Sequence, residues 1–276
     1  MTNQPFLDLS GKRALITGAG GLLGVEHGVA LARCGASVIL SDIHDVGLNG
    51  AREKILRQVP DADILLVQLD ICDEAALVRL LDHLSGDGKQ VDILINNASI
   101  NPKMNSRGTE ISGSVENYSM SGLHQEIQVG IVGTFLCCKV FGSQMAKRGY
   151  GVIINVASDL ALLAPDQRVY APTGKIEDVQ NFKPIGYSIV KSAMLGLNRY
   201  LATYWAHKGV RVNCLLPGGV LNNQPEYLVN QVKERIPMGR WARPSEYQGA
   251  IAFLASESSA YMSGQTLVMD GGRSAW

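Results

Sequence analysis

Short apolar runs alternate along the chain with longer segments in which apolar residues recur every three to four positions. The short runs match buried β-strands, and the longer segments match amphipathic helices. Strands that alternate with helices form a parallel sheet covered on both faces. The pattern therefore predicts an α/β fold with a mostly parallel, seven-stranded sheet, whose strands we expect at residues 13–17, 37–41, 64–69, 91–95, 151–156, 210–216 and 266–269.

Three segments interrupt this alternation. Residues 101–123 are polar and weakly periodic, which is typical of a loop at the ligand edge of a sheet. Residues 165–184 carry mixed charges and three prolines, which predicts an inserted flap at residues 166–183. Residues 221–243 predict a loop with one short helix, which would serve as a substrate lid. Because we find no repeat, low-complexity tract or linker, we predict that residues 1–276 form a single domain.

A glycine-rich turn directly follows the first predicted strand and leads into a helical segment. Gly18, Gly20 and Gly24 would let the backbone approach a pyrophosphate, which the N–H groups at the start of the helix can bind. Asp42 ends the second strand, close to where an acidic residue accepts hydrogen bonds from an adenosine ribose. A carboxylate there would repel a 2′-phosphate, which predicts NAD rather than NADP. The alternative for the glycines is a turn that binds no ligand, and the alternative for Asp42 is an exposed aspartate at a strand end. The position and the residue type of Asp42 together favour the cofactor site.

Two further strand ends carry polar residues at the same edge. Asp70 and Ile71 follow the third strand and would either flank an adenine ring or cap the next helix, since Asp favours helix starts. The sequence leaves both alternatives open. Asn97 and Ala98 follow the fourth strand, where an asparagine can hydrogen bond to backbone across a turn and a small residue leaves room for a cofactor.

Tyr187 and Lys191 are four positions apart in a segment with helical spacing, so their side chains share one helix face. A free phenol has a pKa of ~10 and exchanges protons poorly at neutral pH. A neighbouring ammonium favours the phenolate and lowers that pKa, so Tyr187 would donate a proton to a carbonyl or take one from an alcohol. Taken alone, the spacing of Tyr187 and Lys191 favours an ordinary amphipathic helix. Together with the other motifs of the chain, it favours a catalytic pair.

The composition excludes several classes of function. Lys plus Arg and Asp plus Glu number 25 each, so the formal net charge is zero, which predicts binding to neither nucleic acid nor a membrane surface. The first residues lack the features of a signal peptide, and we expect no apolar run of membrane-spanning length. The five cysteines lack C-x-x-C spacing and nearby histidines, which predicts reduced thiols, no metal site and a cytoplasmic protein.

The ordered set of motifs resembles the short-chain dehydrogenase/reductase family over essentially the whole chain. The matching positions are residues 17–24, 96–98, 217–218, Ser158, Tyr187 and Lys191. The resemblance implies a doubly wound Rossmann-type domain and a homo-oligomer, either a tetramer or a dimer. It implies that Ser158 holds the substrate oxygen and that Tyr187 is the general acid or base. Lys191 would bind the nicotinamide ribose and lower the pKa of the tyrosine.

The same resemblance implies a set of cofactor contacts around the sheet edge. They would come from Gly18, Gly20, Leu22, Leu23, Asp42, Asp70, Ile71, Asn97, Ala98, Tyr187, Lys191, Pro217, Gly218 and Val220. Within the family, the glycine turn and the Ala-Pro-Asp-Gln-Arg stretch are similar to those of dehydrogenases in acidic-sugar and flagellin-modification pathways.

The chain departs from the family pattern in several places. Leu22 and Ser99 stand where glycines are usual, and Gly130 stands where the family has an asparagine thought to connect the lysine to solvent through water. The separation of Ser158 and Tyr187 is also longer than usual, which agrees with an inserted flap. Basic residues in the flap and the earlier loop are either solvated charges or ligands for an anionic group of the substrate; they are Arg168, Lys175, Lys183, Lys103 and Arg107.

We therefore expect an NAD-dependent oxidoreductase that interconverts a secondary alcohol and a ketone on a polar small molecule, such as one derived from a sugar. Hydride would move between the substrate carbon and the nicotinamide while Tyr187 handles the proton. The alternative is a non-catalytic NAD-binding redox sensor or partner subunit, which Gly130 favours. Intact Ser158, Tyr187 and Lys191 argue against it, because a pure binder has no evident need for all three.

Overall fold

The computed structural model describes residues 6–86, 90–101, 114–175 and 181–276. Seven strands form one sheet in the order β3-β2-β1-β4-β5-β6-β7, and every neighbouring pair is parallel. The strands are β1 (Arg13–Thr17), β2 (Ser37–Asp42), β3 (Ile64–Gln68), β4 (Ile93–Asn96), β5 (Gly151–Val156), β6 (Val210–Pro217) and β7 (Thr266–Met269). All seven predicted strands are confirmed, and the doubly wound α/β fold with them.

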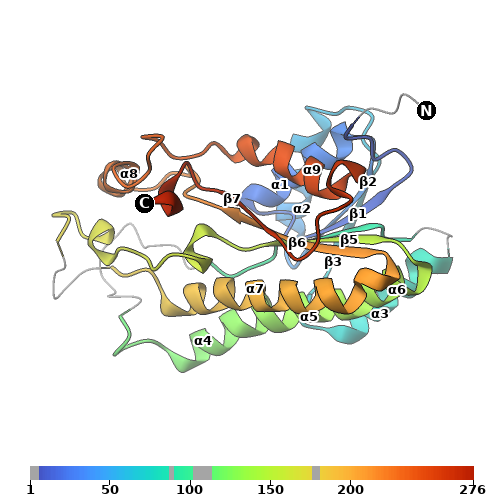
Figure 1. Ribbon diagram of the computed structural model, residues 1–276, viewed down its shortest axis with the longest axis horizontal. Coiled ribbons are helices and arrows are strands. Elements are labelled where there is room, and N and C mark those ends of the chain that lie inside the picture. Colours follow the sequence, from blue (N-terminus) through green and yellow to red (C-terminus); the bar gives the residue numbers. More distant parts are fainter. Residues whose placement is uncertain (1–5, 87–89, 102–113, 176–180) are drawn as a thin grey trace.

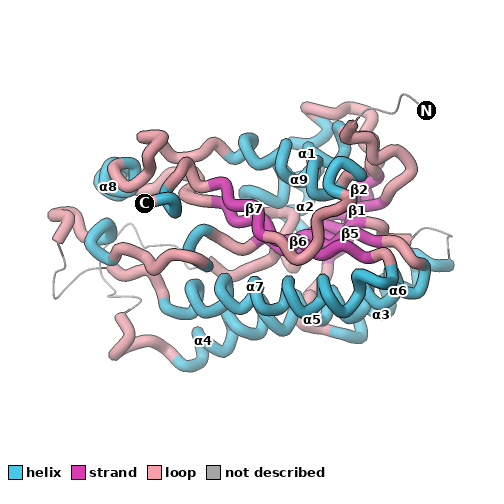
Figure 2. Tube along the Cα trace, in the orientation of Figure 1, coloured by secondary structure: helices cyan, strands magenta, loops and turns pink. Residues whose placement is uncertain are grey.

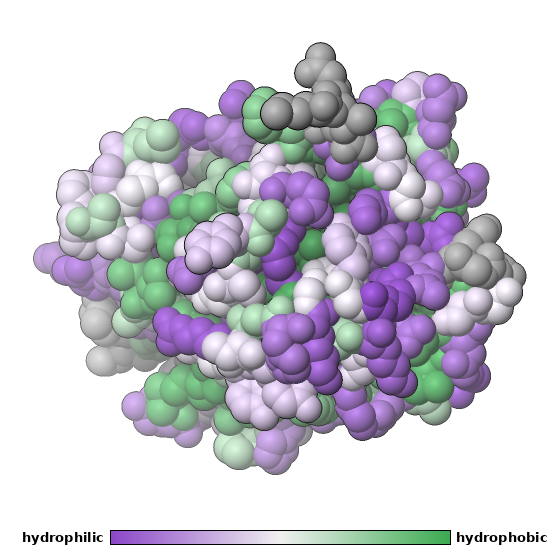
Figure 3. Space-filling view, turned by 45° about the vertical axis from the view of Figure 1, so that its right-hand side comes forward, coloured by the Kyte–Doolittle hydropathy of each residue, from purple (hydrophilic) through white to green (hydrophobic). Residues whose placement is uncertain are grey.

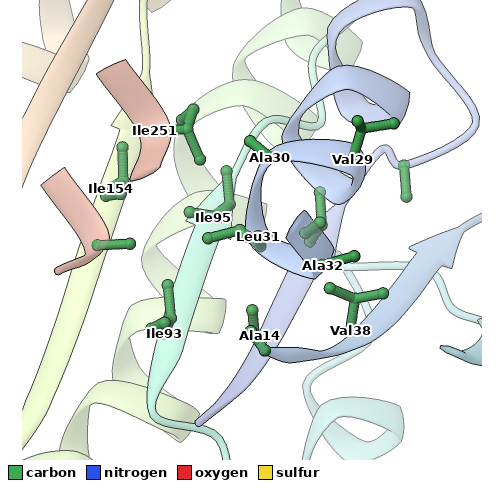
Figure 4. Packing of buried hydrophobic residues seen from close by; sticks show 14 of the residues in the cluster. Ala14, Val29, Ala30, Leu31, Ala32, Val38, Ile93, Ile95, Ile154 and Ile251 are labelled. Atoms are coloured by element: carbon green, nitrogen blue, oxygen red, sulfur yellow. The ribbon is translucent and has the colours of Figure 1, made fainter. Parts of the chain in front are cut away.

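Helices cover both faces of the sheet (Figure 1). One layer contains α1 (Leu22–Arg33), α2 (Asp45–Leu56) and α9 (Gln248–Ala255). The other contains α3 (Glu74–Gly86), α4 (Met120–Ile127), α5 (Thr134–Cys137), α6 (Ser143–Arg148) and α7 (Ile185–Trp205). Side chains of β1, β4 and β5 meet those of α1 and α9 in the first layer (Figure 4). Leu15, Leu94 and Ile153 point to the second layer, as strand alternation requires.

The helical run Met120–Arg148 is continuous and contains two π-helical segments, Gln128–Gly133 and Cys138–Gly142. By length and composition this run could cross a membrane, contrary to the expectation from the sequence. However, 56% of its most apolar 18-residue stretch is buried inside the protein. It packs against α7, α3 and the sheet, so its apolar character is that of a core helix.

Loops and short helices gather at the carboxyl ends of the strands, around α8 (Glu226–Lys233) and the C-terminal residues (Figure 2). The predicted flap and lid meet there. Val169 of the flap is buried against Leu228, Val232 and Ile236 of the lid. Residues 176–180 of the flap lie outside the described residues. The flap and the lid are therefore joined through this small apolar cluster. The face of the molecule drawn in Figure 3 mixes hydrophilic areas with hydrophobic patches.

Candidate active site

The glycine turn between β1 and α1 leaves room only for backbone. Gly18 has a φ of +62°, and a Cβ there would lie 2.7 Å from the Cα of Ala98. Gly21 precedes α1 without a side-chain cap, and the first turn of the helix carries no acidic residue. The N–H groups in the first turn of α1 are thus open to an anion, which is the arrangement that binds a pyrophosphate. Leu22 is exposed beside the turn, whereas Leu23 packs against the core.

Asp42 reaches from the end of β2 to the same turn. Its Oδ2 accepts a hydrogen bond from the Gly20 N–H at 3.1 Å, and its Oδ1 accepts one from the His44 N–H at 3.1 Å. These bonds fix the orientation of the carboxylate and leave further acceptor capacity on both oxygens. The negative charge therefore stands next to the glycine turn, where the sequence predicted it.

Asn97 ties the loop after β4 to the glycine turn. Its Nδ2 donates to the carbonyl oxygens of Thr17 at 3.1 Å and Gly18 at 2.9 Å. The Thr17 hydroxyl oxygen accepts from the N–H groups of Asn97 and Ala98, both at 3.1 Å. The prediction that an asparagine here bonds backbone across a turn is confirmed. Asn96 instead donates to the side chain of Asn155 at 2.9 Å.

Asp70 does not cap α3. Its Oδ1 accepts from the Cys72 N–H at 2.8 Å, while Asp73 accepts from the Ala76 N–H at 3.0 Å at the helix start. The capping alternative for Asp70 is therefore wrong, because a closer aspartate takes that role. Ile71 is buried, and a Cβ added at Gly133 would lie 2.7 Å from its side chain. Contact of this turn with an adenine ring stays a prediction.

The chain leaves β6 beside the last strand. Pro217 ends β6, and the Gly218 N–H donates to the Met269 carbonyl oxygen at 2.9 Å. A Cβ at Gly218 would lie 2.6 Å from the Cα of Asp270, so only glycine fits this close approach. Val220 then pairs with Ala242 in a parallel bridge. The predicted nicotinamide-side residues thus form a tight connection between the sheet and the lid.

Ser158, Tyr187 and Lys191 come together at the carboxyl end of β5. Ser158 is buried just past the strand, and its hydroxyl interacts with the side chain of Tyr187 on α7. The Lys191 ammonium lies 5.7 Å from the centre of the Tyr187 ring and donates to the Val156 carbonyl oxygen at 2.9 Å. Three groups that are distant in the sequence therefore share one place, because α7 packs against β6 and against the short helix Asp159–Ala161 that follows β5.

The pKa values in this cluster are set mainly by burial. Burial raises the pKa of Tyr187, while its interaction with Ser158 acts in the opposite direction. Burial lowers the pKa of Lys191 to about 8. The expectation that Lys191 lowers the pKa of Tyr187 is thus outweighed in this arrangement by loss of water around the phenol.

An ion pair that the sequence did not reveal lies behind Ser158. The Ser158 hydroxyl donates to the Oδ1 of buried Asp159 at 3.0 Å. The Nη1 of Arg273, in the C-terminal segment, lies 3.0 Å from the other carboxylate oxygen. Burial raises the pKa of Asp159, and the charge of Arg273 opposes that shift. An acidic residue directly after a serine at a strand end was the only local signal for this role.

Gly130 lies in the first π-helical segment and faces α7. A Cβ at this position would lie 2.3 Å from Cγ1 of Val190, the residue before Lys191. Its carbonyl oxygen accepts from the Thr134 hydroxyl at 2.9 Å. No asparagine side chain fits between the two helices in this packing. Where the family has an asparagine, this chain therefore has direct contact between the long helix and α7, the helix that carries Tyr187 and Lys191.

Gly130→Ala should destabilise the protein by about 1–3 kcal/mol, because the added methyl group overpacks the contact with Val190. Urea denaturation measures this loss. The matched control is Gly196→Ala on α7, the helix that Gly130 faces. A Cβ at Gly196 meets nothing within 4 Å, and alanine is the better helix former. A Val190→Ala change in the Gly130→Ala background should recover part of the loss. Equal stabilities of the two single variants would show that the helices have room for a side chain.

The basic residues of the flap differ in their surroundings. Arg168 pairs with Asp166 at 2.8 Å, and Arg235 of the lid pairs with the same carboxylate at 2.6 Å. Lys175 is exposed. Lys183, in contrast, places its ammonium 3.8 Å from the centre of the Tyr187 ring. Lys103 and Arg107, of the earlier loop, lie outside the described residues.

Comparisons with known proteins agree over nearly the full chain. A family model described as enoyl-(acyl carrier protein) reductase matches residues 23–274. D-threitol dehydrogenase from Mycolicibacterium smegmatis is 30% identical, with 96% of this chain and 93% of that protein covered. Two solved structures each align with a TM-score of 0.83. They are a gluconate 5-dehydrogenase from Burkholderia cenocepacia in complex with NADP and tartrate (26% identity, 98% of each chain) and a short-chain dehydrogenase from Leptospira borgpetersenii with bound NAD⁺ (28% identity, 99% of this chain and 97% of that one).

These matches extend from the glycine turn to the C-terminal segment, so they rest on the whole fold and not on one motif. The two aligned structures hold NADP and NAD⁺ respectively, which supports a nicotinamide dinucleotide as the cofactor. The open N–H groups in the first turn of α1 fit its pyrophosphate. The chain therefore belongs to the short-chain dehydrogenase/reductase family of oxidoreductases.

Proposed function

We propose that the protein is an NAD-dependent oxidoreductase that interconverts a secondary alcohol and a ketone on a polar, sugar-derived small molecule. The observation that carries this proposal is the meeting of Ser158, Tyr187 and Lys191 at the carboxyl end of β5. The similarity to dehydrogenases of threitol and gluconate supports a polyhydroxylated substrate.

The residues of the chain divide the work around the cofactor. A bound nicotinamide dinucleotide supplies the hydride acceptor or donor. The turn at Gly18 and the start of α1 would hold its pyrophosphate, and Asp42 would accept hydrogen bonds from its adenosine ribose. Lys191 gives one N–H to the Val156 carbonyl, which leaves two donors for the hydroxyls of the nicotinamide ribose.

Tyr187 handles the proton of the reacting oxygen. In ketone reduction its phenol O–H donates the proton to the carbonyl oxygen as hydride reaches the carbon. In alcohol oxidation its phenolate oxygen takes the hydroxyl proton as hydride leaves. Ser158 holds the substrate oxygen at the phenol, and Lys191 stabilises the phenolate that reduction produces. The raised pKa of Tyr187 keeps the phenol protonated at neutral pH, which suits the reductive direction.

A substrate panel tests the proposal. The purified protein with NAD should oxidise at least one polyol or sugar acid, as measured by the absorbance of the reduced nicotinamide. D-threitol, xylitol and D-gluconate are suitable first compounds. Binding of the cofactor without turnover of any substrate would instead support the non-catalytic redox sensor, which the absence of an asparagine at Gly130 favours.

Asp42→Asn should narrow the preference for NAD over NADP by roughly tenfold or more in kcat/KM. Asparagine keeps the shape and one accepting oxygen for the Gly20 N–H, but it removes the charge that repels a 2′-phosphate. Hydrogen bonds to a charged group contribute ~1.5–3 kcal/mol, and ~1.4 kcal/mol corresponds to tenfold. Asp61→Asn, an exposed change before β3, is the control. A wild-type protein that uses both cofactors equally would contradict the role of Asp42.

A further inference from the structure

Lys183 is held in place by the flap. Its backbone N–H donates to the Gln167 side chain at 2.9 Å, and its carbonyl oxygen accepts from the same side-chain amide at 3.3 Å. Pro184 follows and is the N-cap residue of α7. The Gln167 side-chain amide therefore hydrogen bonds to both backbone groups of Lys183. Pro184, whose φ is fixed by its ring, connects Lys183 to the helix that carries Tyr187.

The ammonium of Lys183 lies directly at the catalytic tyrosine. It is 3.8 Å from the centre of the Tyr187 ring and donates to the Asn101 side-chain oxygen at 2.9 Å. Lys183 and Lys191 thus stand four residues before and four residues after Tyr187. Unlike Lys191, which gives a hydrogen bond to the main chain inside the domain, Lys183 is only partly buried.

Three arginines around the site are already paired. Arg168 and Arg235 share Asp166, and Arg273 pairs with Asp159. None of the ion pairs found among the described residues includes Lys183. Among the described residues, the partly buried ammonium of Lys183 has an amide and a ring face as its partners, so it gains from an anion that arrives with the substrate.

We propose that Lys183 binds the carboxylate of the substrate, so that the polar small molecule is a sugar acid. This inference rests on the proposed function and adds the charge of the substrate to it. The carboxylate would accept hydrogen bonds from the Lys183 ammonium, and Asn101 would hold that ammonium in position. Of the basic flap and loop residues that the structure describes, Lys183 alone contacts the catalytic tyrosine. The tartrate in the aligned gluconate 5-dehydrogenase supports an acid as the ligand.

The binding should depend on pH. Burial lowers the pKa of Lys183 to about 8, whereas a sugar-acid carboxylate stays ionised from about pH 5 upward. Affinity for the acid should therefore fall as the pH rises through about 8, where Lys183 loses its proton. Arginine stays protonated over this range, so Lys183→Arg should remove most of this fall. The titratable or charged groups around Lys183 are Tyr187 and Lys191 of α7, Asp159 after β5 and Glu126 of α4.

Calorimetry with D-gluconate and with tartrate, in the presence of NADH, tests the inference without requiring turnover. Lys183→Met should weaken binding of the acids by roughly 10- to 100-fold, as expected for the loss of a hydrogen bond between charged groups. Lys183→Arg should retain most of the affinity. Lys208→Met, an exposed change before β6, is the matched control. The ratio of kcat/KM for an acid to that for the neutral D-threitol should fall in Lys183→Met.

The outcomes separate the two proposals. Equal weakening of acid and neutral ligands in Lys183→Met, or none, would overturn the role of Lys183 even if turnover depends on Tyr187. Conversely, acids that bind through Lys183 but are never oxidised would leave this inference standing and overturn the proposed function. A wild-type protein that oxidises only neutral polyols and binds no acid would also overturn the inference.

Discussion

Tyr187→Phe should lower kcat by ~10²- to 10⁴-fold in both directions of the reaction, which is the usual contribution of one general acid or base. In terms of the activation barrier, this is about 2.7–5.5 kcal/mol. Phenylalanine keeps the ring beneath the Lys183 ammonium and removes only the oxygen that exchanges the proton. Steady-state rates with a substrate identified from the panel, followed through the reduced nicotinamide, measure the effect.

Tyr200→Phe is the matched control, because Tyr200 lies on an exposed face of the same helix and stacks on Tyr204. It should leave the rate unchanged. The wild-type pH profile gives an independent check. Since burial raises the pKa of Tyr187, oxidation should accelerate as the pH rises above neutral and the phenol ionises, whereas reduction should not. A Tyr187→Phe variant with a near-normal rate would remove the tyrosine from the mechanism.

The fold could be predicted from the sequence because its determinants are local. Each strand is a short apolar run, and the helices between them have a clear apolar face, so parallel pairing followed from their alternation. Residues at the sheet edge could also be predicted, since Gly18 and Asn97 directly follow a strand and Asp42 is the last residue of one. The structure places all three around one turn.

Features that depend on packing between distant segments could not be predicted. The contact of Gly130 with Val190 and the hydrogen bonds of Gln167 to Lys183 can be seen only in the three-dimensional structure. The pKa of Tyr187 was expected to be lowered, because the spacing to Lys191 is visible in a sequence while burial of the phenol is not. From the sequence, Gly130 indicated only the loss of the asparagine that would connect Lys191 to solvent. The structure shows that the long helix and α7 are in direct contact at this position.

Arg273→Met should lower the free energy of unfolding by about 3–5 kcal/mol, the usual cost of removing one partner of a buried ion pair. Methionine keeps most of the aliphatic length but leaves the Asp159 carboxylate without its cation. The side chains of Arg273 and Asp159 are only 13% and 3% exposed, so water cannot replace the lost partner. Chemical denaturation near neutral pH measures the loss.

This loss should shrink as the pH falls. Burial already raises the folded-state pKa of Asp159 above the ordinary value of an aspartate, and Arg273 opposes that shift. Without Arg273 the folded-state pKa rises further, so the folded protein binds more protons than the unfolded chain from that pKa down to about 4. Stability of the variant therefore rises relative to wild type as the pH is lowered through this window.

Asp159→Asn in the Arg273→Met background should recover a large part of the stability, because the neutral amide no longer needs a cation. The double-mutant cycle should give a coupling of at least about 1 kcal/mol. Additive losses with no coupling would show that the pair does not stabilise the fold. Since Asp159 also accepts a hydrogen bond from the Ser158 hydroxyl, the ion pair links the C-terminal segment to Ser158, the residue that we propose holds the substrate oxygen. Arg273→Met should therefore perturb turnover under conditions where the variant is still folded.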